Sequence, residues 1–343
     1  MATVREISDR ATWERWLARA ERCGLQQGWA YGEAASAQGQ QVRRFLFARD
    51  GDPLGLAQIL WRRYPMGLGV AMLMRGPVWL QQPDDDEARA IMGAIRSALP
   101  RTLIIWTPDD TDDRPIRCGF RRIYTGYSTI WLDLRPGLDD LRGQLDGKWR
   151  NMLCRAEETG MAVREVRGGQ ALDWLIETNE THRKKVGYRG PSPNFIRALG
   201  MAQPAGRRMV LVAFDNRQPI AGVIMDRHGA SATYYAGCTT ETGRQWRAHH
   251  RLVWEALGRL KASGATALDL GGIDTESSPG VARFKLGTGG EAMTLAGSYL
   301  LPPGRQDTIP VPLYRADLPP VERRRHKKKG PHQRAALPSD PVR

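Results

Sequence analysis

DLGGIDTESSPGVARFKLGTGGE (residues 269–291) is the segment around which we expect the rest of the chain to be organised. We predict that it starts in a strand over residues 266–270, which runs into the glycine pair Gly271 and Gly272. Glycines accept positive φ and let a backbone approach a ligand closely, so this strand end is expected to form the floor of a cleft. Arg283, Phe284 and Lys285 follow after a short polar loop, and the lysine is a candidate electrophilic group. The alternative is an exposed glycine-rich loop with solvated basic side chains.

The segment before this stretch predicts a helix over residues 249–262. Its apolar residues recur at helical spacing, and Gly264 is placed to end the helix as a left-handed cap. These apolar residues are Leu252, Val253, Ala256, Leu257 and Leu260.

Two hairpins with the same layout lie about 165 residues apart in the chain, at residues 43–55 and 207–222. Each is followed by a further strand, an amphipathic helix and a compact apolar strand. This order indicates an internal duplication of a mixed α/β unit. Hairpins that lead into strand–helix–strand segments favour mixed sheets flanked by helices, and two such domains side by side create a cleft for a ligand.

The duplication predicts two domains and a tail. Residues 1–137 are expected to form the first domain, with a strand at 128–134 that closes it. Residues 138–303 are expected to form the second domain, which carries the catalytic motif and ends in a strand at 294–301. Residues 304–343 are expected to be a basic, disordered tail.

Length and composition are those of a soluble globular protein. The chain has 343 residues, 41% of them hydrophobic and 26% charged, which is ample for two cores. Its polar N-terminus lacks the apolar core of a signal peptide, and no apolar run approaches the roughly 20 residues that span a bilayer. We therefore expect a cytoplasmic protein.

The cysteines and histidines do not form a metal-binding pattern. Four cysteines are scattered without a CxxC spacing, and His182, His249 and His250 lack a partner set. This argues against a structural zinc site and against a disulfide framework. No metal and no bound cofactor are expected.

The net charge of +14 is concentrated toward the C-terminus. Residues 304–343 hold ten Lys and Arg against four Asp and Glu, and RRRHKKK (residues 323–329) is a block of like charge. Such a block can contact RNA or an anionic membrane surface, which would place the protein at the inner face of the membrane. The alternative is a tail that only improves solubility.

The order of elements in each half resembles the GNAT acyltransferase fold, and the pairing of two halves resembles the Fem family of aminoacyltransferases. The likeness covers roughly residues 25–302. It is carried by five stretches taken together: LQQGWAYGEA (25–34), KWRNMLCRAEETGMAVRE (148–165), ETHRKKVGYRGPSPNFIRAL (180–199), YYAGCT (234–239), and the helix and strand leading into GVARFKLGTGGE (280–291).

The resemblance implies a fold of two tandem GNAT-like domains and a reaction. The family joins an aminoacyl group from aminoacyl-tRNA to an amine of a peptidoglycan precursor stem peptide, without a covalent enzyme intermediate. Lys285, next to Phe284, matches the lysine that stabilises the transition state, where an oxyanion develops. Asp269 or Asp274 is a candidate acceptor for the proton of the attacking amine, although capping of a turn is the more frequent role of such residues.

The resemblance also implies residues that hold the two substrates. Basic side chains are expected at the phosphates of the acceptor or of the tRNA, and aromatic side chains are expected along the cleft. The candidates are Arg183, Arg189, Lys148, Arg150, Arg283, Trp29 and Tyr235. Gln26, Gln27, Gln38 and Gln40 stand in the segment where better-known members place a lysine, so the acceptor can differ from the usual nucleotide-linked or lipid-linked muropeptide.

Two other functions remain open from the sequence. An N-acyltransferase of the same fold would take its acyl group from acyl-CoA, and GRQWRAHH (residues 243–250) stands where its pyrophosphate loop would be but lacks the second glycine. A non-catalytic protein would use the basic tail to bind RNA or a membrane. The sequence contains no GxSxG, Walker loop or nucleotide-binding GxGxxG, which weakens the hydrolase, NTPase and dehydrogenase hypotheses.

Overall fold

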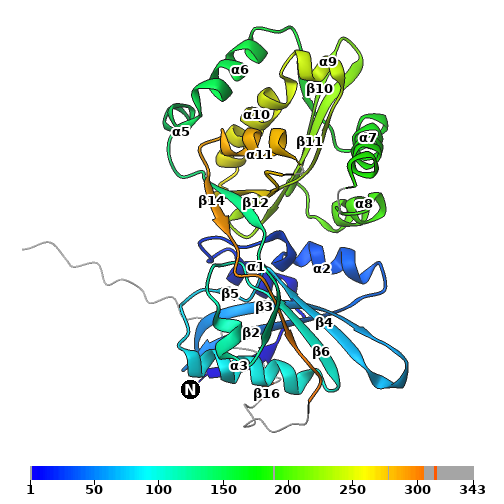
Figure 1. Ribbon diagram of the computed structural model, residues 1–343. Helices are drawn as coiled ribbons and strands as arrows, with labels where there is room; N and C mark the ends of the chain where they lie inside the picture. Colours follow the sequence, from blue (N-terminus) through cyan, green and yellow to red (C-terminus); the bar gives the residue numbers. More distant parts are fainter. Residues whose placement is uncertain (1, 188–189, 277, 305–312, 315–343) are drawn as a thin grey trace, which may run out of the picture.

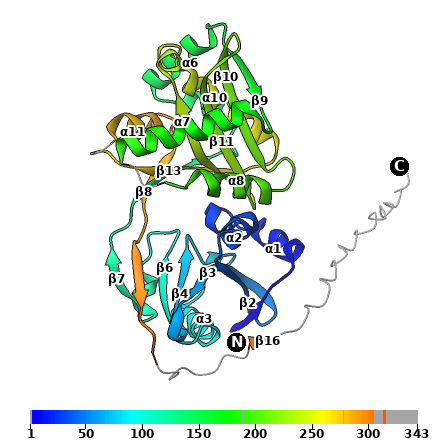
Figure 2. The same ribbon diagram turned by 90° about the vertical axis from the view of Figure 1, so that its right-hand side faces the viewer.

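A computed structural model describes residues 2–187, 190–276, 278–304 and 313–314. The chain forms two halves, each a mixed sheet flanked by helices, stacked one above the other (Figures 1 and 2). This confirms the predicted mixed α/β class.

The first sheet follows the order β16-β1-β2-β3-β4-β6-β15-β7, with β5 paired to β3. Its strands are β1 (Ala2–Glu6), β2 (Gln41–Arg49), β3 (Asp52–Arg63), β4 (Gly69–Met74), β5 (Val78–Trp79), β6 (Thr102–Thr107), β7 (Arg121–Tyr124), β15 (Ser298–Leu301) and β16 (Leu313–Tyr314). The second sheet follows the order β14-β8-β13-β12-β11-β10-β9. Its strands are β8 (Ser128–Asp133), β9 (Ala162–Glu165), β10 (Arg208–Asp215), β11 (Gln218–His228), β12 (Ser231–Thr239), β13 (Ala267–Ile273) and β14 (Glu291–Thr294).

The helices cover both faces of each sheet. Those of the first half are α1 (Arg10–Leu17), η1 (Leu25–Gln27), α2 (Trp29–Ser36), η2 (Pro65–Gly67), α3 (Asp85–Ala98) and α4 (Arg114–Arg117). Those of the second half are α5 (Leu138–Gln144), α6 (Gly147–Glu157), α7 (Gln170–Val186), α8 (Pro193–Ala202), α9 (Glu241–Gln245), α10 (Ala248–Ala262) and α11 (Pro279–Leu286). The predicted helix at 249–262 is present as α10.

Each half has a core on either side of its sheet. In the second half, α6 and α10 bury their apolar faces against one side, and α7 and α8 cover the other (Figure 1). In the first half, α3 packs on one side and α1 on the other. The two halves also share a small core, where Leu25 and Ala34 pack with Leu199 of α8 and where the rings of Tyr31 and Phe195 lie 5.0 Å apart.

Two strands are exchanged between the halves, which differs from the prediction. The strand expected to close the first domain is β8, and it pairs with β13 and β14 of the second sheet. The strand expected to end the second domain is β15, and it pairs with β6 and β7 of the first sheet. The sheets therefore do not follow the predicted boundary at residue 137. Hydrophobic patterning shows that a strand is buried, but it does not show which of two similar sheets receives it.

The two connections between the sheets run past each other (Figure 2). The backbone N–H of Leu295 donates to the carbonyl of Tyr127 at 3.1 Å. A side chain at Gly126 would place its Cβ 1.6 Å from the Leu295 carbonyl oxygen, so the crossing requires glycine there.

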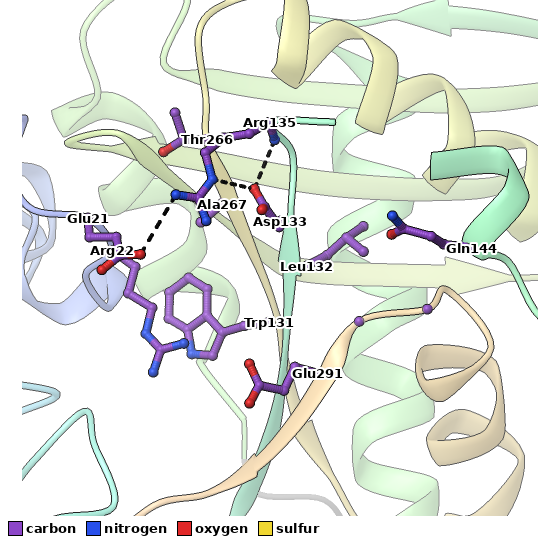
Figure 3. A pocket seen from close by; sticks show the side chains of 12 residues that line it. Glu21, Arg22, Trp131, Leu132, Asp133, Arg135, Gln144, Thr266, Ala267 and Glu291 are labelled. Atoms are coloured by element: carbon purple, nitrogen blue, oxygen red, sulfur yellow. Dashed lines mark hydrogen bonds and ion pairs between the residues drawn. The ribbon is translucent and has the colours of Figure 1, made fainter. Parts of the chain in front are cut away.

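Two cavities lie where the halves meet. One, of about 260 Å³, lies between the segment after α1 and the β8–β14 edge of the second sheet (Figure 3). The other, of about 180 Å³, lies at the strand crossing and is bordered by Arg75 and Tyr127. In the part of the chain that the structure describes, no helix is long and apolar enough to cross a membrane.

Candidate active site

The second sheet opens between its two parallel strands. β12 and β13 are paired at three positions only, from Ser231 opposite Ala267 to Thr233 opposite Asp269. Beyond this point the strands diverge, although both continue. We call this region the β12/β13 opening.

Two irregularities accompany the divergence. The pairing of β11 with β12 shifts by one residue at Tyr235, and the pairing of β13 with β8 shifts between Asp269 and Gly272. Gly271, inside the second irregularity, has φ of 75°, which side-chain-bearing residues rarely adopt. The sequence therefore builds a bulge on each side of the opening, and glycine makes one of them possible.

Lys285 lies at this opening. Its Nζ donates a 2.8 Å hydrogen bond to the Gly272 carbonyl and lies 5.8 Å from the centre of the Tyr234 ring. A Cβ at Gly271 would be 3.7 Å from Nζ and 3.9 Å from the Tyr234 carbonyl oxygen, so the ammonium sits beside both strands. Burial lowers the pKa of Lys285 to about 8, against the opposing effect of Asp269. At neutral pH the side chain is still mostly a cation.

Lys285 belongs to a helix that the sequence did not predict, and not to the exposed glycine-rich loop of the alternative interpretation. α11 begins at Pro279, a favoured first helical residue, and presents Phe284 to the core of the second half. The Phe284 ring lies 5.7 Å from Trp149, 5.3 Å from His249 and 4.9 Å from His250. This aromatic cluster holds α11 against α6 and α10, and it thereby sets the position of Lys285.

Tyr234 and His249 form a polar pair behind the lysine. The Tyr234 hydroxyl and His249 Nε2 are 2.9 Å apart. Burial lowers the pKa of His249 to about 4, helped by the charges of His250 and Lys285, so the imidazole is neutral at pH 7. The pair fixes the tyrosine ring beside the ammonium.

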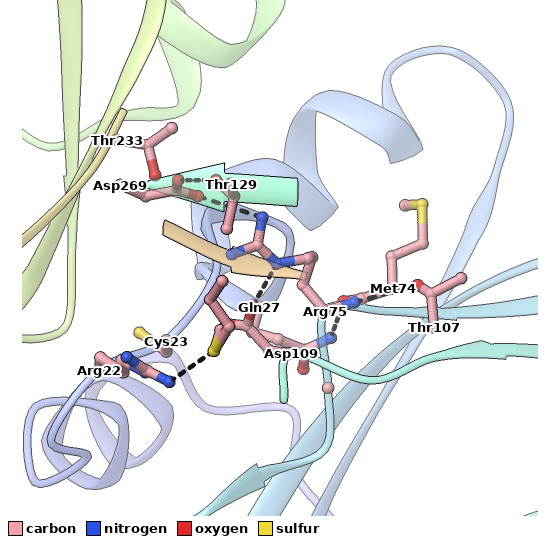
Figure 4. A network of polar contacts seen from close by, with 12 residues as sticks. Arg22, Cys23, Gln27, Met74, Arg75, Thr107, Asp109, Thr129, Thr233 and Asp269 are labelled. Atoms are coloured by element: carbon pink, nitrogen blue, oxygen red, sulfur yellow. Dashed lines mark hydrogen bonds and ion pairs between the residues drawn. The ribbon is translucent and has the colours of Figure 1, made fainter. Parts of the chain in front are cut away.

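A buried ion network ties the opening to the first half (Figure 4). Arg75, which follows β4, bonds to the carboxylate of Asp109 and to the Tyr127 hydroxyl at 2.6 Å. Its Nη1 also lies 3.1 Å from Asp269 Oδ2. The other oxygen of Asp269 accepts from the Thr129 hydroxyl at 2.7 Å and from the Gly271 backbone N–H at 2.8 Å.

The network has two carboxylates for one guanidinium. Burial opposes the charge of Arg75, but Asp109 and Asp269 outweigh it and raise the arginine's pKa. Burial raises the pKa of Asp109 to about 6, with Asp269 adding to the rise and Arg75 opposing it. At pH 7 the network therefore carries excess negative charge beside the opening.

Comparison with known proteins gives matches of two kinds. Residues 142–286 match the family model described as an acetyltransferase (GNAT) domain. Over 87% of this chain and 96% of the other, the fold is similar to a crystal structure of FemX, with a TM-score of 0.74 and 15% identity. No curated protein matches the sequence.

The chain has a Fem-like tandem GNAT fold. It is also similar to a tandem GNAT protein from the clavulanic acid biosynthesis pathway, at 13% identity and a TM-score of 0.52, over 89% of this chain and 99% of that one. A third similar structure, at 16% identity and a TM-score of 0.52, is described as the C-terminal domain of a lysylphosphatidylglycerol synthetase from Agrobacterium fabrum and covers 85% of this chain and 93% of that one. The GNAT match and the Fem-like fold support acyl transfer as the chemistry.

In this Fem-like chain, three predicted site residues come together at the opening. Asp269 lies within β13, Lys285 of α11 bonds to Gly272 near the end of this strand, and Phe284 packs against the core of the second half. Asp269 is buried and its carboxylate contacts Arg75, Thr129 and Gly271. Asp274 is exposed and accepts from the Glu276 backbone N–H at 2.9 Å. The turn-capping geometry expected for both carboxylates is present.

The predicted phosphate-binding residues are spread over several elements. Lys148 and Arg150 are exposed on α6, and Arg283 is exposed on α11. Arg183 pairs with Glu180 at 2.6 Å, one helical turn after Asn179, which donates to the Gly237 carbonyl on the diverging part of β12. Arg189 lies outside the described residues.

The two aromatic candidates are more enclosed than expected. Trp29 is only 9% exposed, and the Arg44 guanidinium lies 3.5 Å from the centre of its ring. Tyr235 is half-buried between α8 and the sheet, and burial raises the pKa of its hydroxyl. Of the glutamines, Gln27 is fully buried and its amide bonds to the backbone of Gln58 and Met74.

Three residues of the site were not found from the sequence: Arg75, Asp109 and Tyr127. The duplication held a signal for Asp109, because this residue follows the first-half strand that corresponds to β13. Arg75 and Tyr127 carry no such signal, since their importance comes from the packing of one half on the other.

Proposed function

We propose that this protein is an aminoacyltransferase that forms an amide between the aminoacyl group of an aminoacyl-tRNA and an amine of a peptidoglycan precursor stem peptide or a similar acceptor. The observation that carries the proposal is the position of Lys285. This half-buried cation lies at the β12/β13 opening, where the parallel strands of the second sheet diverge in the part of the chain that the structure describes. The Fem-like fold supports acyl transfer, and the lysine supplies what that chemistry needs.

The proposed transfer is a direct attack of the amine on the ester and needs no covalent intermediate on the enzyme. The amine nitrogen attacks the ester carbonyl, the carbon–nitrogen bond forms, and the carbon–oxygen bond to the tRNA ribose breaks. The ribose hydroxyl takes up a proton, and the ammonium formed at the attacking nitrogen loses one to solvent or substrate. Lys285 faces the oxyanion that develops on the carbonyl, and the Gly272 carbonyl keeps its ammonium in place.

The acceptor amine is proposed to arrive through the cavity at the strand crossing. Tyr127 borders this cavity and also lies against Gly272, where an added Cβ would be 3.4 Å from the tyrosine ring. The excess negative charge of Asp109 and Asp269 beside it attracts an ammonium group. Holding both substrates on either side of Tyr127 contributes to the rate through proximity.

The basic residues Lys148, Arg150, Arg183 and Arg283 are proposed to contact phosphates of the tRNA or of the acceptor. The tail at residues 304–343 is proposed to add contacts to RNA or to an anionic membrane surface, with the protein at the cytoplasmic face of the membrane. The net charge of +14 supports a polyanionic partner.

Acyl-CoA is the second candidate donor. A CoA pyrophosphate needs free backbone N–H groups before the helix that follows the opened strand. Between residues 240 and 250, where α9 is followed by the first turn of α10, the N–H groups of Gly243, Arg244, Trp246, Arg247 and His250 already bond to acceptors within this segment. This favours the tRNA donor over CoA.

The test is a donor and acceptor panel analysed by mass spectrometry. The protein is incubated with charged tRNA or acetyl-CoA and with a set of muropeptides, and the products are identified by their masses. We expect transfer from charged tRNA to an amine. Transfer from acetyl-CoA alone would overturn the proposal in favour of the second candidate, and no transfer from any donor would favour a binding protein.

A deletion separates the tail from the reaction. Removal of residues 319–343 is expected to weaken binding to tRNA and to vesicles that contain phosphatidylglycerol, while turnover at saturating substrate persists. If the deletion instead abolishes turnover without affecting either binding, the tail belongs to the catalytic machinery and the proposed accessory role is wrong.

A further inference from the structure

The cavity of about 260 Å³ is not part of the opening that holds Lys285. It lies where the segment after α1 meets β8 and β14 (Figure 3), and Lys285, Tyr234 and Gly272 do not line it. Its lining carries both signs of charge: Glu21, Asp133 and Glu291 against Arg22 and Arg135. Such a mixture binds neither a plain polyanion nor an apolar ligand well.

Two donors in this cavity have no good acceptor. Trp131 is 4% exposed, and its Nε1 has no hydrogen-bond partner among the residues that the structure describes. The Arg22 guanidinium lies 5.4 Å from the Trp131 ring centre and donates to the Met293 thioether at 3.2 Å, a weak acceptor. Buried donors are nearly always paired, and the Trp131 N–H is not; an oxygen bound between Trp131 and the half-buried Arg22 would accept from both.

One carboxylate in the cavity also lacks a partner. Glu291 is opposite Trp131 in the register of β14 with β8, its side chain is exposed, and it forms no ion pair with any described residue. The other charges are already matched, since Arg135 bonds to Asp133 at 2.8 Å and lies 3.8 Å from Glu21. Arg22, whose charge also acts on Asp109 and Asp110, and Glu291 form no close ion pair with a described residue, and Trp131 lies between them (Figure 3).

We propose that this cavity binds a free α-amino acid. The amino acid's carboxylate accepts from Arg22 and from Trp131 Nε1, and its ammonium group donates to Glu291. A zwitterion supplies both missing partners at once, whereas a carboxylic acid or an amine supplies only one. The cavity volume suits a small amino acid and excludes a folded macromolecule.

The site adjoins the ion network without belonging to it. Trp131 is opposite Asp269 in the register of β8 with β13, and its ring centre lies 5.8 Å from Arg75 Cζ. Trp131, which lines the cavity, is thus also next to the Arg75–Asp269 pair. Binding here does not depend on the proposed transfer reaction, so the two proposals can fail separately.

The test measures binding of L-alanine, L-serine and L-lysine to the full chain by saturation-transfer NMR, with propionate and ethylamine as probes that carry one charged group each. We expect at least one amino acid to bind with a Kd of about 10 mM or tighter, and both one-charge probes to bind at least about tenfold more weakly. Arg22→Met and Glu291→Gln are each expected to weaken amino-acid binding by about tenfold or more. Arg217→Met and Glu276→Gln change exposed residues elsewhere and are expected to leave binding unchanged.

Trp131→Phe gives a milder variant, because it removes the N–H and keeps the ring; about a threefold to tenfold loss is expected. Circular dichroism of each variant reports whether it folds. The proposal is overturned if none of the three amino acids binds, if propionate binds as well as L-alanine, or if folded Glu291→Gln keeps wild-type affinity.

Discussion

The two halves share one strand plan, yet only the second half opens. In the first sheet, β4 and β6 stay paired over six positions, from Gly69 opposite Thr102 to Met74 opposite Thr107. The Arg75 backbone N–H then donates to the Thr107 carbonyl at 2.7 Å and extends the contact by one residue. In the second sheet, the corresponding strands separate after three positions.

The residues at the ends of these strands explain the difference. The second half has a bulge in β12 and a left-handed glycine in β13, while the pairing of β3 with β4 runs without a shift. At the place where the first half would open, Arg75 and Asp109 fill the space and reach across to Asp269. Duplication has thus produced one half that opens for a ligand and one half whose strand ends support that opening.

The largest effect is expected from removing Asp269 from the ion network that joins it to Arg75 and Asp109. Asp269→Ala removes an ion pair with Arg75 and the acceptor of Thr129 and Gly271, and it leaves a buried guanidinium with one carboxylate fewer. We expect a loss of about 3–5 kcal/mol in the free energy of unfolding, measured by urea denaturation. Asp52→Ala, at an exposed position in the first-half hairpin, is the matched control and should cost less than about 0.5 kcal/mol. Equal stabilities of the two variants would show that the network does not join the halves.

The next effect concerns the opening itself. Lys285→Met keeps the apolar length of the side chain and removes the charge, so it is expected to lower kcat about 100-fold to 1000-fold, or ~2.7–4 kcal/mol in the barrier. Donor binding should change little, because the oxyanion exists only in the transition state. Lys185→Met, on exposed α7 surface, serves as the control. Wild-type turnover in Lys285→Met would remove the lysine from the mechanism.

The division into two similar halves and the position of the opening could be predicted from the sequence. The hairpin repeats gave two mixed α/β halves, and the Gly271–Gly272 pair marked the strand end where Lys285 lies. The exchange of β8 and β15 was not predicted, because an apolar strand such as Ser128–Asp133 fits either sheet equally well. The helix α11 was not predicted, since its glycine-flanked and polar residues have little helical patterning. Arg75 was missed because its partners are separated from it by 34 and 194 positions and meet only after both halves have folded.

A smaller effect tests why the second sheet opens. Gly271→Ala introduces a side chain at φ of 75°, which costs about 1–2 kcal/mol in stability. The new Cβ would lie in ordinary contact with Lys285 Nζ, so strain and not a clash causes the loss. Gly143→Ala, within α5 and with no atom near the added Cβ, is expected to be neutral or to stabilise by up to about 1 kcal/mol. Equal behaviour of both variants in thermal denaturation would mean that the bulge relaxes without glycine.

The last effect is absent at neutral pH and appears only above it. Because burial lowers the pKa of Lys285 to about 8, its ammonium form is complete below pH 7 and declines about tenfold per unit above pH 8. The acceptor amine loses its proton as pH rises, which increases the rate and hides the effect of Lys285. Comparison with Lys285→Arg cancels this contribution, because both enzymes use the same acceptor and arginine keeps its charge across the whole pH range. We expect the ratio of kcat/KM for wild type to that for the arginine variant to be constant below pH 7 and to fall about tenfold per unit above pH 8. A ratio that stays flat to pH 10 would show that the charge of Lys285 does not act on the transition state, even if its side chain is needed to shape the opening.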